Sequence, residues 1–114
     1  MSKHDDRTSM RQMLEYARKA RNIAMGRRRE DLDRDEVLQL ALTRAVEVIG
    51  EAAGRISDAT RNQHSEIPWR DIVGMRNRLI HGYDAVDANL LWDTVTVDLP
   101  PLIEALERIL GEKK

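Results

Sequence analysis

The chain of 114 residues has no cysteine, no phenylalanine and no long run of apolar residues. The absence of cysteine excludes a disulfide framework and any metal site built on thiolates, and it fits a reducing compartment. The first ten residues are polar and lack the apolar core of a secretory signal. No apolar stretch approaches the length that a membrane span needs. We therefore expect a cytoplasmic protein that does not enter a membrane.

Aromatic residues make up only 4% of the chain, against 41% hydrophobic and 34% charged residues. The core must then consist of aliphatic side chains, which is typical of helix bundles. The length suits one domain. These features predict an all-α fold, an up-and-down bundle of four to five helices over residues 1–114, with residues 1–7 as a flexible tail.

The net charge of −1 hides an uneven distribution along the chain. Residues 1–29 hold nine Lys and Arg against three acids, whereas residues 84–112 hold seven acids and one base. A basic first helix could face a phosphate backbone or an acidic partner. It could equally be a solvated face that is matched by acids elsewhere in the chain.

Apolar spacing predicts a first helix from about Thr8 to about Arg28. Asp33 and Glu36 have the spacing of a capping box, which predicts the start of a second helix that continues to Ile56. Val37, Leu40 and Val48 make this helix apolar on more than one side. We expect it to pack both within its own bundle and against a second subunit. Gly50 and Gly54 would allow a close approach of another helix.

The second half of the chain predicts three more helices. After a polar connection over residues 57–67, Pro68 suits the first turn of a helix that spans residues 69–81 and stops at Gly82. Asp87 would cap a fourth helix carrying Leu90 to Val97. Asp98 would cap a last helix, with Pro100 and Pro101 in its first turn and Gly111 at its end. No alternation of period two is long enough to require a sheet.

The segment Arg76-Asn77-Arg78-Leu79-Ile80-His81-Gly82-Tyr83 places polar groups beside an apolar helix. On an ideal helix Arg76 and His81 would point about 140° apart. A joint site therefore requires that the helix end or distort near His81, or that a second copy complete it. A structural interpretation also fits: His81 would stabilise a helix C-terminus, and Arg76 would pair with Asp71 or Asp84.

Arginine and histidine can cleave RNA without a metal ion, because RNA carries its own nucleophile, the ribose 2′-OH. A histidine near neutral pKa can accept that proton or protonate the leaving oxygen. A guanidinium can hold the phosphate and stabilise the charge of the transition state. Arg76 and His81 are thus the candidate catalytic residues, with Asn77 in support, and the product would be a 2′,3′-cyclic phosphate.

Other candidate sites are weaker. His4 lies in the tail and His64 in a connection, and neither has carboxylates at a ligand spacing, so we expect no metal and no cofactor. Glu47 and Glu51 lie one helical turn apart and could form a carboxylate pair. Such residues are more often solvated or paired with a neighbour such as Arg44 or Arg55.

From residue 37 to residue 110 the sequence resembles the HepT family of the HEPN superfamily. The resemblance rests on the segments 44–53 and 67–77, on Leu79-Ile-His-Gly-Tyr83, and on Trp92 and Asp98-Leu-Pro100, in the family's order and spacing. The family's R-x4-H-x-Y motif falls on Arg76, His81 and Tyr83. At Asp84-Ala85 the chain departs from relatives, which often have an aromatic residue and glycine there.

The resemblance implies a helical homodimer in which two such motifs meet. It implies a metal-independent ribonuclease that acts as the toxin of a toxin–antitoxin pair. The partner would be a minimal nucleotidyltransferase that transfers AMP to Tyr83 and silences the enzyme. The alternative is a noncatalytic helical partner of a nucleotidyltransferase.

Overall fold

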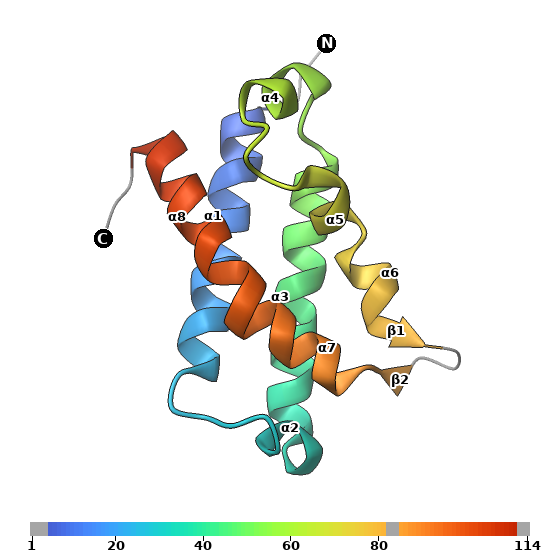
Figure 1. The fold of residues 1–114 in the computed structure, drawn as a ribbon. Coiled ribbons are helices and arrows are strands. Elements are labelled where there is room, and N and C mark those ends of the chain that lie inside the picture. Colours follow the sequence, from blue (N-terminus) through green and yellow to red (C-terminus); the bar gives the residue numbers. More distant parts are fainter. Residues whose placement is uncertain (1–4, 82–84, 112–114) are drawn as a thin grey trace.

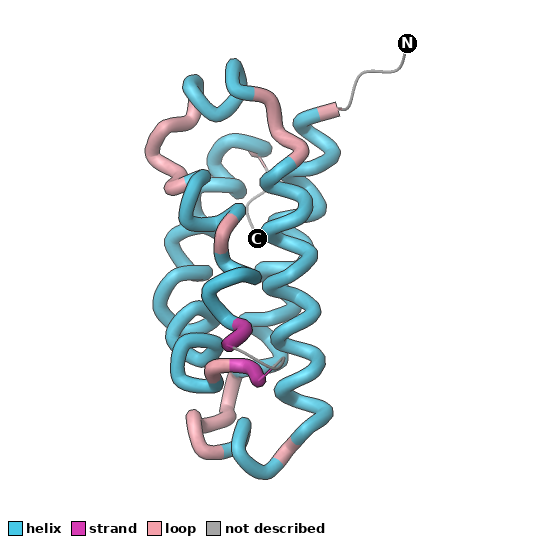
Figure 2. The backbone as a smooth tube through the Cα atoms, turned by 90° about the vertical axis from the view of Figure 1, so that its right-hand side faces the viewer, coloured by secondary structure: helices cyan, strands magenta, loops and turns pink. Residues whose placement is uncertain are grey.

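The computed structural model describes residues 5–81 and 85–111, and for residues 80, 81 and 85 only the backbone. The long helix α1 (Asp6–Ala24) packs along both α3 (Glu36–Gly54) and α8 (Leu99–Leu110). The chain runs down α1, up α3, down the opposite side of α3 and up again into α8 (Figure 1). The bundle is elongated, 44 × 33 × 23 Å (Figure 2). The all-α fold class is confirmed.

Shorter elements join the long helices. They are α2 (Asp31–Arg34), α4 (Asp58–Gln63), α5 (Trp69–Val73), α6 (Met75–Leu79), α7 (Ala88–Asp93) and the π-helical segment η1 (Thr94–Asp98). Strands β1 (Ile80–His81) and β2 (Ala85–Val86) form a small antiparallel pair in which Ile80 faces Val86 and His81 faces Ala85. The described chain thus has more and shorter helices than the four or five that the sequence predicted.

Helix α1 begins two residues earlier than predicted. The carboxylate of Asp5 accepts a hydrogen bond from the backbone N–H of Arg7, which caps the helix. The pKa of Asp5 lies below its usual value, mainly because the hydroxyl of Thr8 donates to the carboxylate and also because the N–H of Arg7 does so. Arg7, which the sequence assigned to a flexible tail, lies in the helix and donates to the carbonyl of Leu110 at 2.8 Å. The tail prediction was therefore wrong for residues 5–7.

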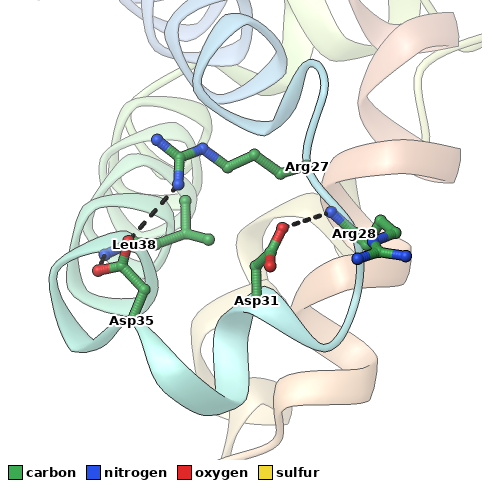
Figure 3. A network of polar contacts seen from close by, with 5 residues as sticks. All are labelled: Arg27, Arg28, Asp31, Asp35 and Leu38. Atoms are coloured by element: carbon green, nitrogen blue, oxygen red, sulfur yellow. Dashed lines mark hydrogen bonds and ion pairs between the residues drawn. The ribbon is translucent and has the colours of Figure 1, made fainter.

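Helix α3 is capped by Asp35 and not, as predicted, by Asp33. The Asp35 carboxylate accepts from the backbone N–H of Leu38 at 3.0 Å and lies 3.5 Å from Arg27 (Figure 3). Asp31 in turn accepts from the backbone N–H of Arg28 at 2.8 Å. Asp33 lies inside the one-turn helix α2. It therefore cannot cap α3, the role that the capping-box spacing predicted for it.

The helix predicted over residues 69–81 is interrupted. It forms α5, turns at Gly74, continues as α6 and ends at Leu79, where the chain enters β1. The backbone N–H of Asp87, which follows β2, donates to the carbonyl of Leu79 at 2.7 Å and so takes the place of a helical donor. The polar connection before it is also partly helical, because Ser57 caps α4 through the N–H of Thr60. Gly82, the predicted stop, lies outside the described residues.

The fourth and fifth predicted helices form one continuous path. Asp87 caps α7 through the N–H of Leu90, as predicted. Asp98 makes no side-chain cap, contrary to prediction, because the chain is already helical there. Pro100 and Pro101 lie in the first turn of α8. Because proline has no backbone N–H, the carbonyl groups of the preceding π-helical turn η1 lack these two donors. Gly111 ends α8 with a φ of +71°, as predicted.

The core is aliphatic, as the composition predicted. Its fully buried side chains come from every long helix and from the segments that follow α5. The largest are Met13, Leu14, Leu42, Ile49, Leu79, Leu91, Leu99 and Leu106. Within the described residues, no helix is long and apolar enough to cross a membrane.

Candidate active site

The candidate site is built on α6, which is held against α3. A Cβ atom on Gly50 of α3 would lie only 3.2 Å from the carbonyl oxygen of Ile72, at the end of α5. The glycine therefore permits the close approach that the sequence predicted at this position. At Gly54, the other predicted contact, nothing in the described chain lies within 4 Å. Buried Met75 and Leu79 anchor α6 itself.

Arg76 points from α6 towards α3 and remains 56% exposed. Its Nε donates to Oε2 of Glu47 at 3.4 Å. The predicted pairing of Arg76 with Asp71 was wrong, and Asp84 lies outside the described residues. The partner, Glu47, lies on α3, outside the motif and 29 residues before Arg76 in the sequence. Sequence reasoning missed this pairing because the two residues are far apart in the chain.

Glu47 bridges two arginines. Its Oε1 lies 3.6 Å from Nη1 of Arg44, one turn earlier on α3, while Oε2 faces Arg76. The side chain of Glu47 is only 22% exposed, whereas the side chains of Arg44 and Arg76 are both more than half exposed. The pairing of Glu47 with Arg44 confirms one of the two sequence interpretations. The cluster as a whole is cationic, with one negative and two positive groups.

His81 lies beyond the end of α6, in β1. The chain therefore leaves the helix before His81, as a joint site with Arg76 requires. The side chain of His81 and all of Tyr83 lie outside the described residues, so their roles remain predictions. Asn77, which the sequence predicted in a supporting role, is exposed on α6.

A cavity of about 420 Å³ lies along α6, between α5 and the start of α8, and sequence reasoning did not find it. Its walls include Ile72, Met75 and Leu102, and Arg78 lines it as well. Asp71 and Asp98 also line the cavity, so carboxylates disfavour the entry of a phosphate there. Arg76 lines no part of it. The Glu47–Arg76 side of α6 is the better surface for an anion.

Two basic residues of α1 have acidic partners within the bundle. Arg18 donates through Nη2 to Glu107 of α8 at 2.8 Å, and Lys19 lies 3.4 Å from Glu15. Of the two sequence interpretations, these contacts favour a helix face matched by acids elsewhere. Among residues 5–81 and 85–111, no three His, Asp or Glu side chains gather as ligands for a metal ion.

Comparison with known proteins gives the family. The family model "Ribonuclease HepT-like" matches residues 13–109. A protein of Thermococcus cleftensis named "Probable ribonuclease HepT" is 44% identical over 70% of this chain and 73% of its own. "Putative RNase TTE0752" of Caldanaerobacter subterraneus subsp. tengcongensis is 39% identical over 75% of this chain and 76% of its own.

A third relative extends the similarity over nearly the full length. "Putative RNase MJ1216" of Methanocaldococcus jannaschii is 31% identical over 98% of this chain and 93% of its own. No solved structure matches. The matched region includes α3, α6 and the whole candidate site, and the chain belongs to the HepT-like ribonuclease family.

Proposed function

We propose that this ribonuclease cleaves RNA without a metal ion, at a site formed by Arg76 and His81. The observation that carries the proposal is the position of Arg76. Its side chain is more than half exposed, and among the described residues its guanidinium is bound through Nε alone. The chain also leaves the helix just before His81. An anion can therefore reach the two terminal nitrogens of Arg76.

The proposed reaction is a transesterification. His81 accepts the proton of the ribose 2′-OH, and the 2′ oxygen forms a bond to phosphorus while the bond from phosphorus to the 5′ oxygen breaks. Arg76 stabilises the additional negative charge on the phosphoryl oxygens. The 5′ oxygen takes up a proton from water as it leaves. The products are a 2′,3′-cyclic phosphate and a 5′-hydroxyl, and Asn77 would help to orient the phosphate.

We propose that the active form is a homodimer that packs through α3. Val37 and Leu40 are 75% and 62% exposed, and with Arg44 they follow a spacing of three and four residues along one side of the helix. We call these three residues the exposed α3 stripe. The stripe continues into Glu47 and Arg76, so two copies that pair here would bring their sites near each other.

We further propose a toxin role for this ribonuclease in the cytoplasm, with a minimal nucleotidyltransferase as antitoxin. The support is family membership together with the motif Arg76, His81 and Tyr83. AMP on the Tyr83 hydroxyl would add bulk and negative charge two residues from His81, where it would repel the RNA phosphate. The modified protein would then be inactive.

The test is cleavage of labelled RNA in EDTA by wild type, Arg76→Ala, His81→Ala and Arg78→Ala. Arg78 is the matched control, because it carries the same charge on the same helix but lines the cavity. We expect losses of about 100-fold or more for Arg76→Ala and His81→Ala. The cleavage rate of Arg78→Ala should stay within about threefold of the wild-type rate, because this variant loses only an exposed charge near the substrate.

Equal activity of the wild type and both site variants would refute the proposed site. A wild type that is inactive although its intact mass shows no AMP would favour the alternative, a noncatalytic partner of a nucleotidyltransferase. Cyclic phosphate ends, found only with wild type and Arg78→Ala, would establish the reaction.

A further inference from the structure

We infer that Glu47 is a positioning residue for Arg76 and orients its guanidinium for the scissile phosphate. The inference rests on the proposed function, in which Arg76 contacts the phosphate. Glu47 lies outside the motif, 29 residues before Arg76 in the sequence, and nothing in the sequence pairs the two residues.

The atoms in contact support this role. A guanidinium is planar and has five N–H donors in a fixed arrangement. Glu47 accepts from Nε, the guanidinium nitrogen that is bonded to the aliphatic part of the Arg76 side chain. The two terminal nitrogens make no hydrogen bond within the described residues and can together hold two oxygens of a phosphate. Glu47 thus restricts the rotation of the group while leaving its phosphate-binding end open.

The placement of Glu47 supports it as well. Arg76 belongs to a helix of five residues, whereas Glu47 lies near the middle of α3, between buried Val46 and Val48. The contact ties a long, exposed side chain to the central helix of the bundle. Fixing a catalytic group in a productive orientation lowers the entropic part of the barrier, and small misplacements cost large factors in rate.

The charge of Glu47 would oppose phosphate binding if nothing offset it. Arg44 lies 3.6 Å from the other carboxylate oxygen and supplies that offset. The three groups together carry one net positive charge. The carboxylate can therefore orient Arg76 without making the site repel RNA. Because such a partly exposed pair adds little to folding, its loss should change the rate and not the stability.

The experiment measures kcat and KM for RNA cleavage by wild type, Glu47→Ala and Glu47→Gln. Glu104→Ala is the matched control, because it removes a carboxylate from the exposed side of α8. We expect Glu47→Ala to lower kcat about 10- to 100-fold with little change in KM. Glu47→Gln should recover most of the loss, since the amide oxygen still accepts from Nε. Glu104→Ala should behave as wild type, and thermal midpoints should agree throughout.

A double-mutant cycle separates this inference from the proposed function. In the Arg76→Ala background, Glu47→Ala should cause no further loss, because its effect passes through Arg76. Wild-type or higher activity of Glu47→Ala would overturn the inference, and so would equal losses in the Ala and Gln variants. If Arg76→Ala itself remains active, the proposed function fails. If Arg76→Ala is inactive and Glu47→Ala is not, only the role of Glu47 fails.

Discussion

At the scale of single residues, aspartates cap the first turn of three helices, α1, α3 and α7. Asp5, Asp35 and Asp87 each stand just before a helix and accept from a backbone N–H that has no partner within it. An aspartate only two positions before one of these caps has a different role. Asp33 pairs with Arg29 at 3.1 Å on an exposed surface instead.

This difference predicts unequal effects for two neighbouring substitutions. Asp35→Ala should lower the free energy of unfolding by about 1 kcal/mol, because the N–H of Leu38 loses its acceptor. Asp33→Ala should cost less than about 0.5 kcal/mol, since an exposed ion pair contributes little. Urea denaturation followed by circular dichroism measures both. A larger loss for Asp33→Ala would mean that the helix start is misassigned.

At the scale of elements, the packing of α5 and α6 on α3 places the candidate site. Gly50 brings the backbone of α5 close to α3, and α6 then presents Arg76 to Glu47. The site thus depends on a backbone contact several residues away from either charged group.

Two glycines of α3 test this packing. Gly50→Ala should destabilise the protein by about 1–2 kcal/mol, because the new methyl group meets the carbonyl of Ile72, a backbone atom that cannot turn aside. Gly54→Ala meets nothing within 4 Å and should be neutral or stabilising by up to about 1 kcal/mol through its higher helix propensity. Thermal and urea unfolding compare the two. Equal stability of both variants would contradict the close approach.

At the scale of the whole molecule, the exposed α3 stripe is the surface on which the proposed dimer depends. Large apolar side chains exposed on a helix face beside a candidate site are typical of an interface. Val97 is exposed to the same extent as Leu40. It lies on η1, where it lines the cavity and is not part of the exposed α3 stripe. The two positions therefore allow a matched comparison.

We expect Leu40→Asp to convert the dimer to a monomer and to reduce RNA cleavage at least tenfold, because a buried unpaired charge at an interface is costly. Val97→Asp should leave both properties unchanged. Sedimentation velocity gives the oligomeric state, and the cleavage assay is run at the same concentrations. A Leu40→Asp variant that remains dimeric would place the interface elsewhere, and a monomeric wild type would refute the dimer itself.

The sequence by itself determined the all-α class, the aliphatic core, the caps at Asp87 and Gly111 and the family motif. These features depend on neighbours within one or two helical turns, so local spacing is enough to predict them. The predicted cap at Asp33 failed because a second turn of helix, α2, competed for the same residues. The predicted helix over residues 69–81 ends early, at Leu79, because Ile80 and His81 pair with β2, which follows later in the chain.

Only the tertiary structure decided which groups meet. The Glu47–Arg76 contact, the approach of α5 to Gly50 and the matching of Arg18 by Glu107 join residues that lie 20 or more positions apart. Each depends on how whole helices pack, and that packing is fixed by the sum of many small apolar contacts in the core. No short pattern records such a sum, so the motif could name Arg76 but could not name the carboxylate beside it.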